Sequence, residues 1–112
     1  MSRLQIVYKV VGTNWYEDTG KYHSARITPF NEQCQCLHYE INKQTKAPYK
    51  DTPIYVFDNL WDAQSFHCSI IEKILKCVGK MSKIIPERFN GEEHVDGTVF
   101  CDWVFPFEEV QL

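Results

Sequence analysis

The sequence predicts an α+β fold, in which five to six strands form a mainly antiparallel sheet and one amphipathic helix, at about residues 59–70, packs on one face. Several short segments alternate apolar and polar residues, which is the period of a strand, and turn residues separate them. A single segment repeats apolar residues at helical spacing instead. The chain has 112 residues, of which 44% are hydrophobic. This length and this share of core-forming residues predict one domain over residues 1–112.

The first half of the chain is expected to hold three strands. In "LQIVYKVV", apolar residues recur at every second position: Leu4, Ile6, Tyr8 and Val10. Turn residues in "GTNWYEDTG" then lead into "KYHSARI", so that the two segments form a hairpin with a long loop. The third strand is "CQCLHYEI", with an apolar face made of Leu37, Tyr39 and Ile41. A polar loop, "NKQTKAPYKDTP", follows it.

A strand that leads directly into a helix is the clearest local prediction. The continuous apolar run Ile54 to Phe57 suits a central strand. Asp58 comes next, and it can accept hydrogen bonds from the free N–H groups of the first helical turn. Helical spacing then places four apolar residues on one face: Leu60, Ala63, Phe66 and Ile70.

Two further strands are expected after the helix. The first covers Ile74 to Val78 and stops at Gly79. A loop with two turn dipeptides, Asn90-Gly91 and Asp96-Gly97, precedes the second. In that last strand, "TVFCDWVFPF", strict alternation puts four residues on one face: Val99, Cys101, Trp103 and Phe105. Pro106, which has no N–H to donate, is expected at the edge or the end of the strand.

Charge and composition argue against several classes of partner. The net charge is −3 and no clustered positive face is present, so we expect no nucleic-acid partner. No stretch approaches the roughly 18 apolar residues of a membrane span, so we expect no membrane partner. The five cysteines are an odd number without a repeated spacing, which favours free thiols in a reducing compartment. The protein is therefore expected to be intracellular and cytoplasmic.

The stretch "QCQCLHYE", residues 33–40, raises the question of a metal site. In a strand, Cys34, Cys36, His38 and Glu40 share one face, and alternate side chains lie about 6.5–7 Å apart. Two thiolates on one zinc need their sulfurs within about 4 Å of each other, so a site at Cys34, Cys36 and His38 would require a bend in the chain. Small half-buried thiols beside a surface histidine are the simpler interpretation. No metal and no cofactor are predicted.

A cysteine nucleophile is the alternative chemistry, because a thiolate needs a nearby base or cation to lower its pKa. Cys36 with His38 is the pair on which such an enzyme would depend, and Cys68 beside His67 is a second pair. The carboxylates around His94 are interpreted as a solvated loop. The common nucleotide-binding, zinc-protease and serine-hydrolase motifs do not occur in the sequence.

Aromatic residues outside the predicted core favour a role in recognition. Large rigid rings contribute much contact area at low entropic cost, and interface hot spots are rich in Trp and Tyr. The residues expected to bind are Trp15, Tyr16, Tyr49, Trp61 and Trp103. Tyr22 and Phe107 belong to the same group of expected surface aromatics.

The middle of the chain reads "YEINKQTKAPYKDTPIYVFDNLWDAQSFHCSI", followed by "ILKCVGK". It resembles an uncharacterised family of small α+β proteins from phages, large DNA viruses and microbes. In these, a tyrosine strand leads to a T-x-A-P loop, an apolar Y-V-F-D strand, an A-x-x-F helix and a K-C-x-x-G strand. The match covers roughly residues 36–79, and "YKVV" at residues 8–11 is a weaker match. The resemblance implies the strand–helix–strand order and no activity, cofactor or site residue.

Together these observations predict a non-catalytic protein-binding or assembly module, in the host cytoplasm if its origin is viral. Its partner is expected to be another protein or a second copy. Self-association could use the final strand, since an unpaired edge can pair with an identical edge across a two-fold axis. The alternative is a small enzyme that uses Cys36 and His38.

Overall fold

A computed structural model describes residues 3–12, 21–24, 37–47, 53–66, 72–84 and 96–111, and at positions 21, 23 and 24 it describes the backbone alone. The described residues form seven strands and one helix. In chain order these are β1 (Leu4–Gly12), β2 (Lys21–Ser24), β3 (His38–Glu40), β4 (Thr45–Lys46), β5 (Ile54–Phe57), α1 (Leu60–Phe66), β6 (Glu72–Met81) and β7 (Thr98–Glu109).

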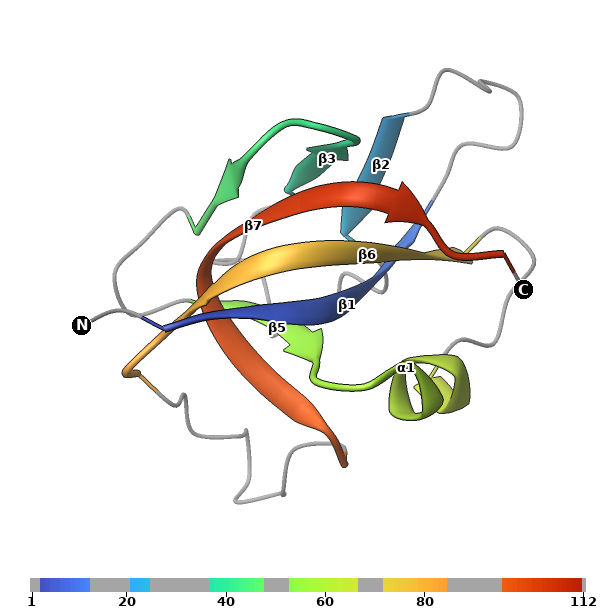
Figure 1. Ribbon diagram of the computed structural model, residues 1–112. Coiled ribbons are helices and arrows are strands. Elements are labelled where there is room, and N and C mark those ends of the chain that lie inside the picture. Colours follow the sequence, from blue (N-terminus) through green and yellow to red (C-terminus); the bar gives the residue numbers. More distant parts are fainter. Residues whose placement is uncertain are drawn as a thin grey trace, which may run out of the picture.

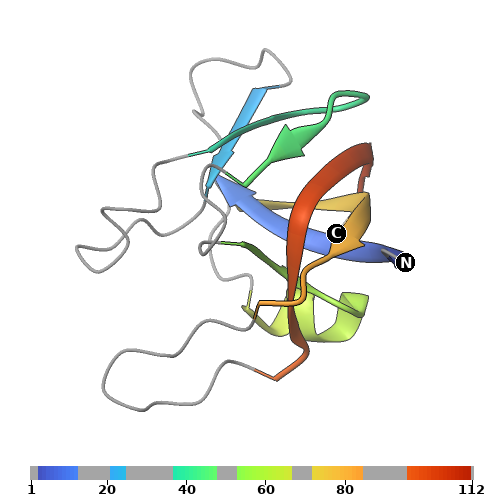
Figure 2. The ribbon, with the colours of Figure 1, turned by 90° about the vertical axis from the view of Figure 1, so that its left-hand side faces the viewer.

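The strands form one strongly curved sheet in which every described pairing is antiparallel. β6 lies in the middle and pairs along its length with β1 on one side and β7 on the other. β5 then joins the two outer strands, because it pairs with β7 over four residues and with β1 at Tyr8 and Phe57. β1, β6, β7 and β5 therefore close into a ring, and Figures 1 and 2 show the long β7 bending from β5 to β6.

The predicted fold class is confirmed, and three details differ. The polar loop after β3 contains the two-residue strand β4, which pairs with β7 at Trp103 and Val104. β6 does not stop at Gly79 but continues to Met81, and β7 continues past Pro106 to Glu109. The helix is described from Leu60 to Phe66, so that Ile70 lies outside the described residues.

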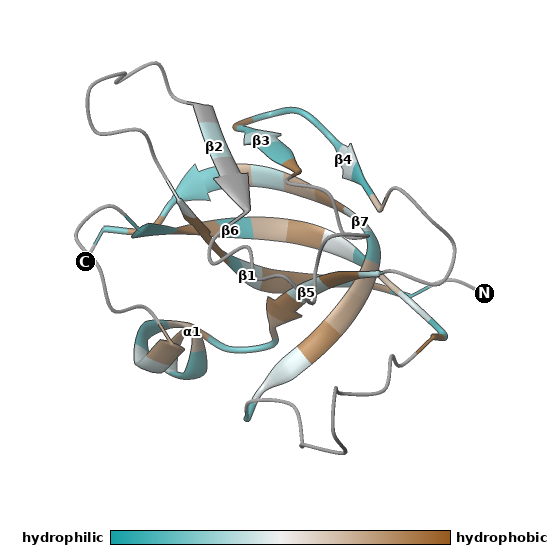
Figure 3. Cartoon of the chain, turned by 180° about the vertical axis from the view of Figure 1, so that it is seen from behind, coloured by the Kyte–Doolittle hydropathy of each residue, from teal (hydrophilic) through white to brown (hydrophobic). Residues whose placement is uncertain are grey.

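The main core lies inside the ring of strands. Its buried members come from six of the strands: Val7, Val11, Tyr22, Tyr39, Ile54, Val56, Leu75, Cys77, Cys101 and Val104. Tyr22, expected on the surface, is buried here, and its hydroxyl donates a hydrogen bond of 2.8 Å to Glu109 Oε1 at the end of β7. Seen from behind, apolar residues follow β1, β5 and the middle of β6, whereas β3 and β4 are mostly hydrophilic (Figure 3).

A second, smaller core lies between α1 and the outer side of the sheet. Val10, Phe57, Ala63 and Ile74 are buried there. Tyr8, Leu60, Phe66 and Val110 pack against them at the margin. Ala63 is the described helix residue that is fully buried, as expected from the helical spacing. The helix thus covers one end of the outer face of β1 and β6.

The helix is capped by Asn59 rather than by Asp58. Asn59 Oδ1 accepts a hydrogen bond of 2.9 Å from the N–H of Asp62, the third helical residue. The Asn59 side-chain amide also donates to Asp62 Oδ2 at 2.7 Å. Asp58 instead uses its backbone N–H, which donates to the Gly97 carbonyl at 3.0 Å. The sequence prediction placed the cap one residue too early, because both residue types can fill this role.

Replacing Asn59 with alanine should lower the free energy of unfolding by about 1 kcal/mol, because the Asp62 N–H loses its capping acceptor. Asp58→Ala is the matched control and should change stability by less than about 0.5 kcal/mol, since its backbone contact is kept and the hydrogen bond that its Oδ1 accepts from the Asn59 amide is exposed to solvent. Urea unfolding of the two variants measures both changes in the free energy of unfolding. Equal losses in both, or a larger loss in Asp58→Ala, would mean that Asn59 is not the cap.

Two β-bulges set the direction of the side chains on β7. Met81 pairs with Cys101 and Lys80 pairs with Trp103, so Asp102 is an extra residue without a partner on β6. Further along, Phe107 is extra in the same way. One inserted residue reverses which side chains point to each side of the sheet. The prediction of a shared face is therefore wrong: Val99 and Cys101 pack against the main core, whereas Trp103 and Phe105 lie on the outer face and Val104 is buried.

The final strand is not the unpaired edge that self-association was expected to use. One side of β7 pairs with β6. On the other side, β5 pairs with residues 98–101 and β4 with Trp103 and Val104. The Pro106 carbonyl there accepts a hydrogen bond of 2.7 Å from the N–H of Asn42. Both sides of β7 are thus occupied over most of its length.

Candidate interaction surface

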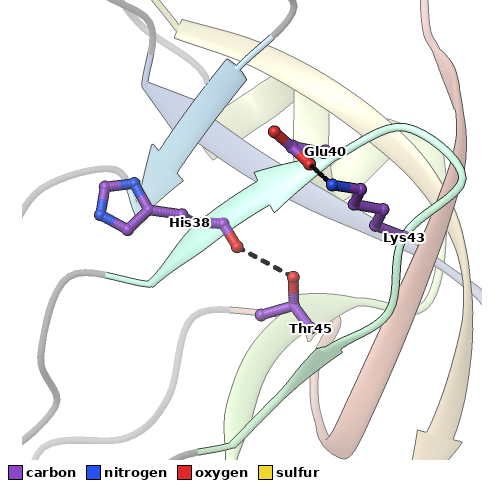
Figure 4. A network of polar contacts seen from close by, with 4 residues as sticks. All are labelled: His38, Glu40, Lys43 and Thr45. Carbon is purple, nitrogen blue, oxygen red and sulfur yellow. Dashed lines mark hydrogen bonds and ion pairs between the residues drawn. The ribbon is translucent and has the colours of Figure 1, made fainter.

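His38 lies on β3 at an exposed position, next to the turn that connects β3 to β4. The turn from β3 to β4 is closed by a 3.2 Å hydrogen bond from the N–H of Lys43 to the Glu40 carbonyl. Asn42 takes a φ of 65°, a left-handed conformation that asparagine tolerates well. A Glu40–Lys43 ion pair of 2.8 Å and a 2.9 Å hydrogen bond from Thr45 Oγ1 to the His38 carbonyl brace the turn. The imidazole points away from this ion pair (Figure 4).

The cysteines predicted to act with His38 lie in a part of the chain that the structure does not describe. Cys34 and Cys36 lie outside the described residues, as do Cys68, His67 and His94. The metal and nucleophile hypotheses at Cys34, Cys36 and His38 therefore stay predictions. Among the side chains that the structure does describe, no group of three or more His, Cys, Asp or Glu could hold a metal ion.

The two described cysteines are buried in the main core. Cys77 and Cys101 are both free thiols with no exposed surface. Burial is the main cause that raises the pKa of each to about 12, because a thiolate would lose its hydration there. Lys9, on the core-facing side of β1, offsets this rise in part. Both thiols are therefore neutral at physiological pH and act as small apolar groups.

Cys77 and Cys101 should resist iodoacetamide at pH 8 in the folded protein and react fully in denaturant, since their thiolates do not form while buried. Peptide mapping by mass spectrometry separates them from the other three cysteines. The same pKa rise makes the unfolded state release these protons first, so the free energy of unfolding should decline as pH rises from 9 toward 12. Labelling of folded Cys77 or Cys101 as fast as a free thiol would contradict the burial.

The aromatic residues that were expected to bind fall into two groups. Trp15, Tyr16 and Tyr49 lie outside the described residues, so their role stays a prediction. Trp61 stands alone on the outer side of α1 with 76% of its surface exposed. Trp103 is half-buried on β7, and it belongs to a larger apolar surface.

That surface is the outer face of β1, β6 and β7, where the register aligns residues in rows across the three strands. One row contains Leu4, Lys80 and Trp103, and the next contains Ile6, Val78 and Phe105. The following rows, with Tyr8 and then Val10 and Ile74, run beneath α1 and belong to the smaller core. The first two rows are not part of that core, and Leu4 and Ile6 keep 57% and 42% of their surface exposed.

We call the apolar residues of this open end the outer strip: Leu4, Ile6, Val78, Trp103, Phe105 and Phe107. Phe107 is 37% exposed and belongs here because it is the second bulge residue, which faces the same side as its neighbour Glu108. Lys76 Nζ lies 6.0 Å from the centroid of the Phe107 ring, an attractive cation–π geometry. The strip thus unites three strands that are far apart in the sequence.

Charges of both signs lie within and beside the outer strip. Lys80 Nζ and Asp102 Oδ2 lie 3.9 Å apart, with both side chains partly exposed, so this ion pair contributes little to stability. Lys76 lies opposite Glu108 in the register. Alternating signs on a partly apolar face suit a protein partner better than a nucleic acid, whose phosphates need one clustered positive charge.

Most of the outer strip was not recognised from the sequence. Leu4 and Ile6 were expected on one apolar strand face together with Tyr8 and Val10, and nothing local shows which end of that face the helix leaves open. Phe105 was expected on one face with Val99 and Cys101, because the bulge at Asp102 has no signal in the sequence. The available signal was the unusual density of aromatic residues in "FCDWVFPF", more than one buried face needs.

No protein-family model, curated protein or solved structure matches this chain. The described helix is too short to cross a membrane. The family resemblance of the central segment therefore remains a prediction, and the function must be argued from the surface itself.

Proposed function

We propose that the protein is a non-catalytic protein-binding or assembly module, and that the outer strip is its contact surface. The observation that supports this most is the exposure of apolar side chains at one end of a sheet face whose other end is covered by α1. Burying apolar surface is favourable by about 25 cal/mol per Å². A contiguous patch of such residues on a small protein typically marks an interaction site.

The composition of the outer strip fits a protein interface. Trp103, Phe105 and Phe107 provide rigid rings, and residues of this kind dominate binding energies when a partner covers them. Lys80 lies between Leu4 and Trp103, and Lys76 and Asp102 lie beside the strip. Charged groups in an interface add specificity more than affinity. We further propose, from the odd number of cysteines without a repeated spacing, that this module acts inside cells. The resemblance suggests the host cytoplasm if the protein is viral.

Photo-crosslinking tests the proposal because it captures whichever partner covers the strip, whatever its identity. The photoreactive amino acid p-benzoylphenylalanine is placed at position 105 in the full chain, and at position 61 as the matched control. Trp61 is the more exposed aromatic residue, but it lies on α1 and not on the outer strip. A discrete adduct, to another protein or to a second copy, is expected from position 105 and much less from position 61.

Two results would count against the proposal. One is the absence of any discrete adduct from position 105 in the cells that produce the protein. The other is the same set of adducts from positions 105 and 61, because exposure alone would then explain the reaction. In a follow-up, if the adduct contains a different protein, Phe105→Ser should weaken capture of that protein at least about tenfold, the effect of losing one well-covered ring.

A further inference from the structure

The hydrogen bonds between β1 and β6 show which backbone groups of β1 are directed elsewhere. The Arg3 carbonyl accepts a hydrogen bond of 2.9 Å from the N–H of Met81. In an antiparallel pair, alternate residues exchange hydrogen bonds with the neighbouring strand, and the residues between them point to the opposite edge. Arg3 and Gln5 therefore bond to β6, whereas the N–H and C=O groups of Leu4 and Ile6 point away from it.

No described strand pairs with Leu4 or Ile6 on that opposite edge. β5 reaches β1 at Tyr8, and β2 reaches it at Val11 and Gly12. β5 ends at Phe57, which pairs with Tyr8, and the chain then continues into Asn59, the cap of α1. Within the described ranges, the start of β1 thus combines a free row of backbone donors and acceptors with two largely exposed apolar side chains. Such an edge is suited to accept another strand.

We propose that this edge binds a second copy of the same chain, through antiparallel pairing of two β1 strands about a two-fold axis at Gln5. This pairing places Leu4 of each copy opposite Ile6 of the other. Both residues direct their N–H and C=O groups to the shared edge, so the two pairs can exchange four backbone hydrogen bonds. The hydrogen-bonding pattern of β1 is therefore complementary to itself in this register.

Side chains and charges agree with this register. Leu4 and Ile6 lie on the same face, so the pairing creates two apolar cross-strand contacts. No charged residue occurs from Leu4 to Val7, and Arg3 would face Val7 of the other copy rather than another cation. The Arg3 guanidinium is already held by Gln5 Oε1 at 2.7 Å. The backbone pattern would accept any strand, and a second copy is favoured because it brings Leu4 and Ile6 opposite each other without opposing like charges.

The pairing extends the outer strip. The two three-stranded faces become one continuous face in the order β7, β6, β1, β1, β6, β7, with an outer strip on each side of the axis. This inference rests on the proposed function, since Leu4 and Ile6 of the outer strip are the residues that meet the second copy. It concerns the edge of β1, however, and leaves the rings of Trp103, Phe105 and Phe107 open.

The test introduces charged residues that face each other across the two-fold axis. The readout is the molar mass, measured by light scattering after size exclusion over a wide range of concentrations. The wild-type chain should rise from 13.2 kDa toward twice that mass. The double variant Leu4→Lys/Ile6→Lys puts like charges opposite each other, and so does Leu4→Glu/Ile6→Glu. Each alone should stay at the mass of one chain, with an association constant at least about tenfold below wild type. An equal mixture of the two should recover the doubled mass.

Phe105→Ser is the control that separates this inference from the proposed function, because it removes a ring of the outer strip and leaves the edge intact. It should dimerise like wild type. Wild-type protein that stays at the mass of one chain throughout, or a mixture of the charge variants that does not recover the doubled mass, would overturn self-pairing through this edge. An adduct from position 105 to a different protein would leave the proposed function standing in either case.

Circular dichroism confirms that each variant is folded. Amide hydrogen exchange of Leu4 and Ile6 in the wild type gives a readout without any substitution, because self-pairing should slow it as the protein concentration rises.

Discussion

Val104→Asp is expected to prevent folding, whereas Phe105→Asp should give a folded protein. Val104 has no exposed surface and packs in the main core, so aspartate there would be an unpaired buried charge that costs several kcal/mol. Phe105 lies on the outer face, where a carboxylate stays hydrated. A domain of this size is typically stable by about 5–15 kcal/mol, so the first change removes most of that margin.

The comparison discriminates sharply because an uninterrupted strand would give the opposite result. Without the bulge at Asp102, Phe105 would point to the core together with Cys101, and Val104 would face solvent. Circular dichroism and thermal unfolding of the two variants are sufficient. A folded Val104→Asp beside an unfolded Phe105→Asp would show that the register of β7 is wrong.

Gly79→Ala should lower the free energy of unfolding by about 1–3 kcal/mol, as expected for overpacking of a tight core. A methyl group at this position would lie 2.7 Å from Cys101 Sγ and 2.9 Å from Val7 Cγ2. These distances are too short for van der Waals contact, and both neighbours are buried. Glycine is needed in the middle of β6 because β1 and β7 direct side chains toward its Cα.

Removing the sulfur should relieve part of the overpacking. Cys101→Ala alone costs stability by leaving a small cavity. In the double variant Gly79→Ala/Cys101→Ala, the new methyl group occupies part of the space of the lost sulfur. We expect the double variant to be more stable than the sum of the single changes by about 1 kcal/mol, which urea unfolding can resolve. Simple additivity would mean that the two side chains do not compete for this space.

The sequence was sufficient to predict the elements in which apolar residues recur with an unbroken period. β5 and α1 follow from a short apolar run and a helical repeat, and Ala63 is buried where the repeat places it. Tyr39 is in the core and His38 is exposed, as alternation from Leu37 to Ile41 predicts. The turn at Asp96-Gly97 is present as well, with Gly97 at a φ of 81° that favours glycine.

The remaining errors come from tertiary contacts that leave no local pattern. Gly79 was predicted to end a strand. The structure instead needs a glycine there because Cys101, which is distant in sequence, packs against its Cα. Pro106 read as a strand end, yet it lies within β7 at a point where its carbonyl accepts from Asn42. The bulge at Asp102 places an extra residue that only the register of β6 against β7 can show.

The candidate surface was missed for the same reason. Reversing the direction of side chains after Asp102 separates Trp103 and Phe105 from the face of Val99 and Cys101 and places them on the outer face. Leu4 and Ile6 form a surface because the described part of α1 packs on the rows from Tyr8 onward. The proposed contact surface therefore contains Leu4, Ile6, Val78 and Phe105, which were not among the residues predicted to bind.

The register of β6 against β7 tests the central claim most directly, because the outer strip exists only if Asp102 is a bulge. In antiparallel pairs that are not hydrogen-bonded to each other, the Hα atoms lie closest, and nuclear Overhauser effects between them report the register. We expect one such contact between Gly79 and Val104 and another between Met81 and Cys101. A contact between Gly79 and Trp103 in place of the first would mean an unbroken ladder, a buried Phe105 and no outer strip.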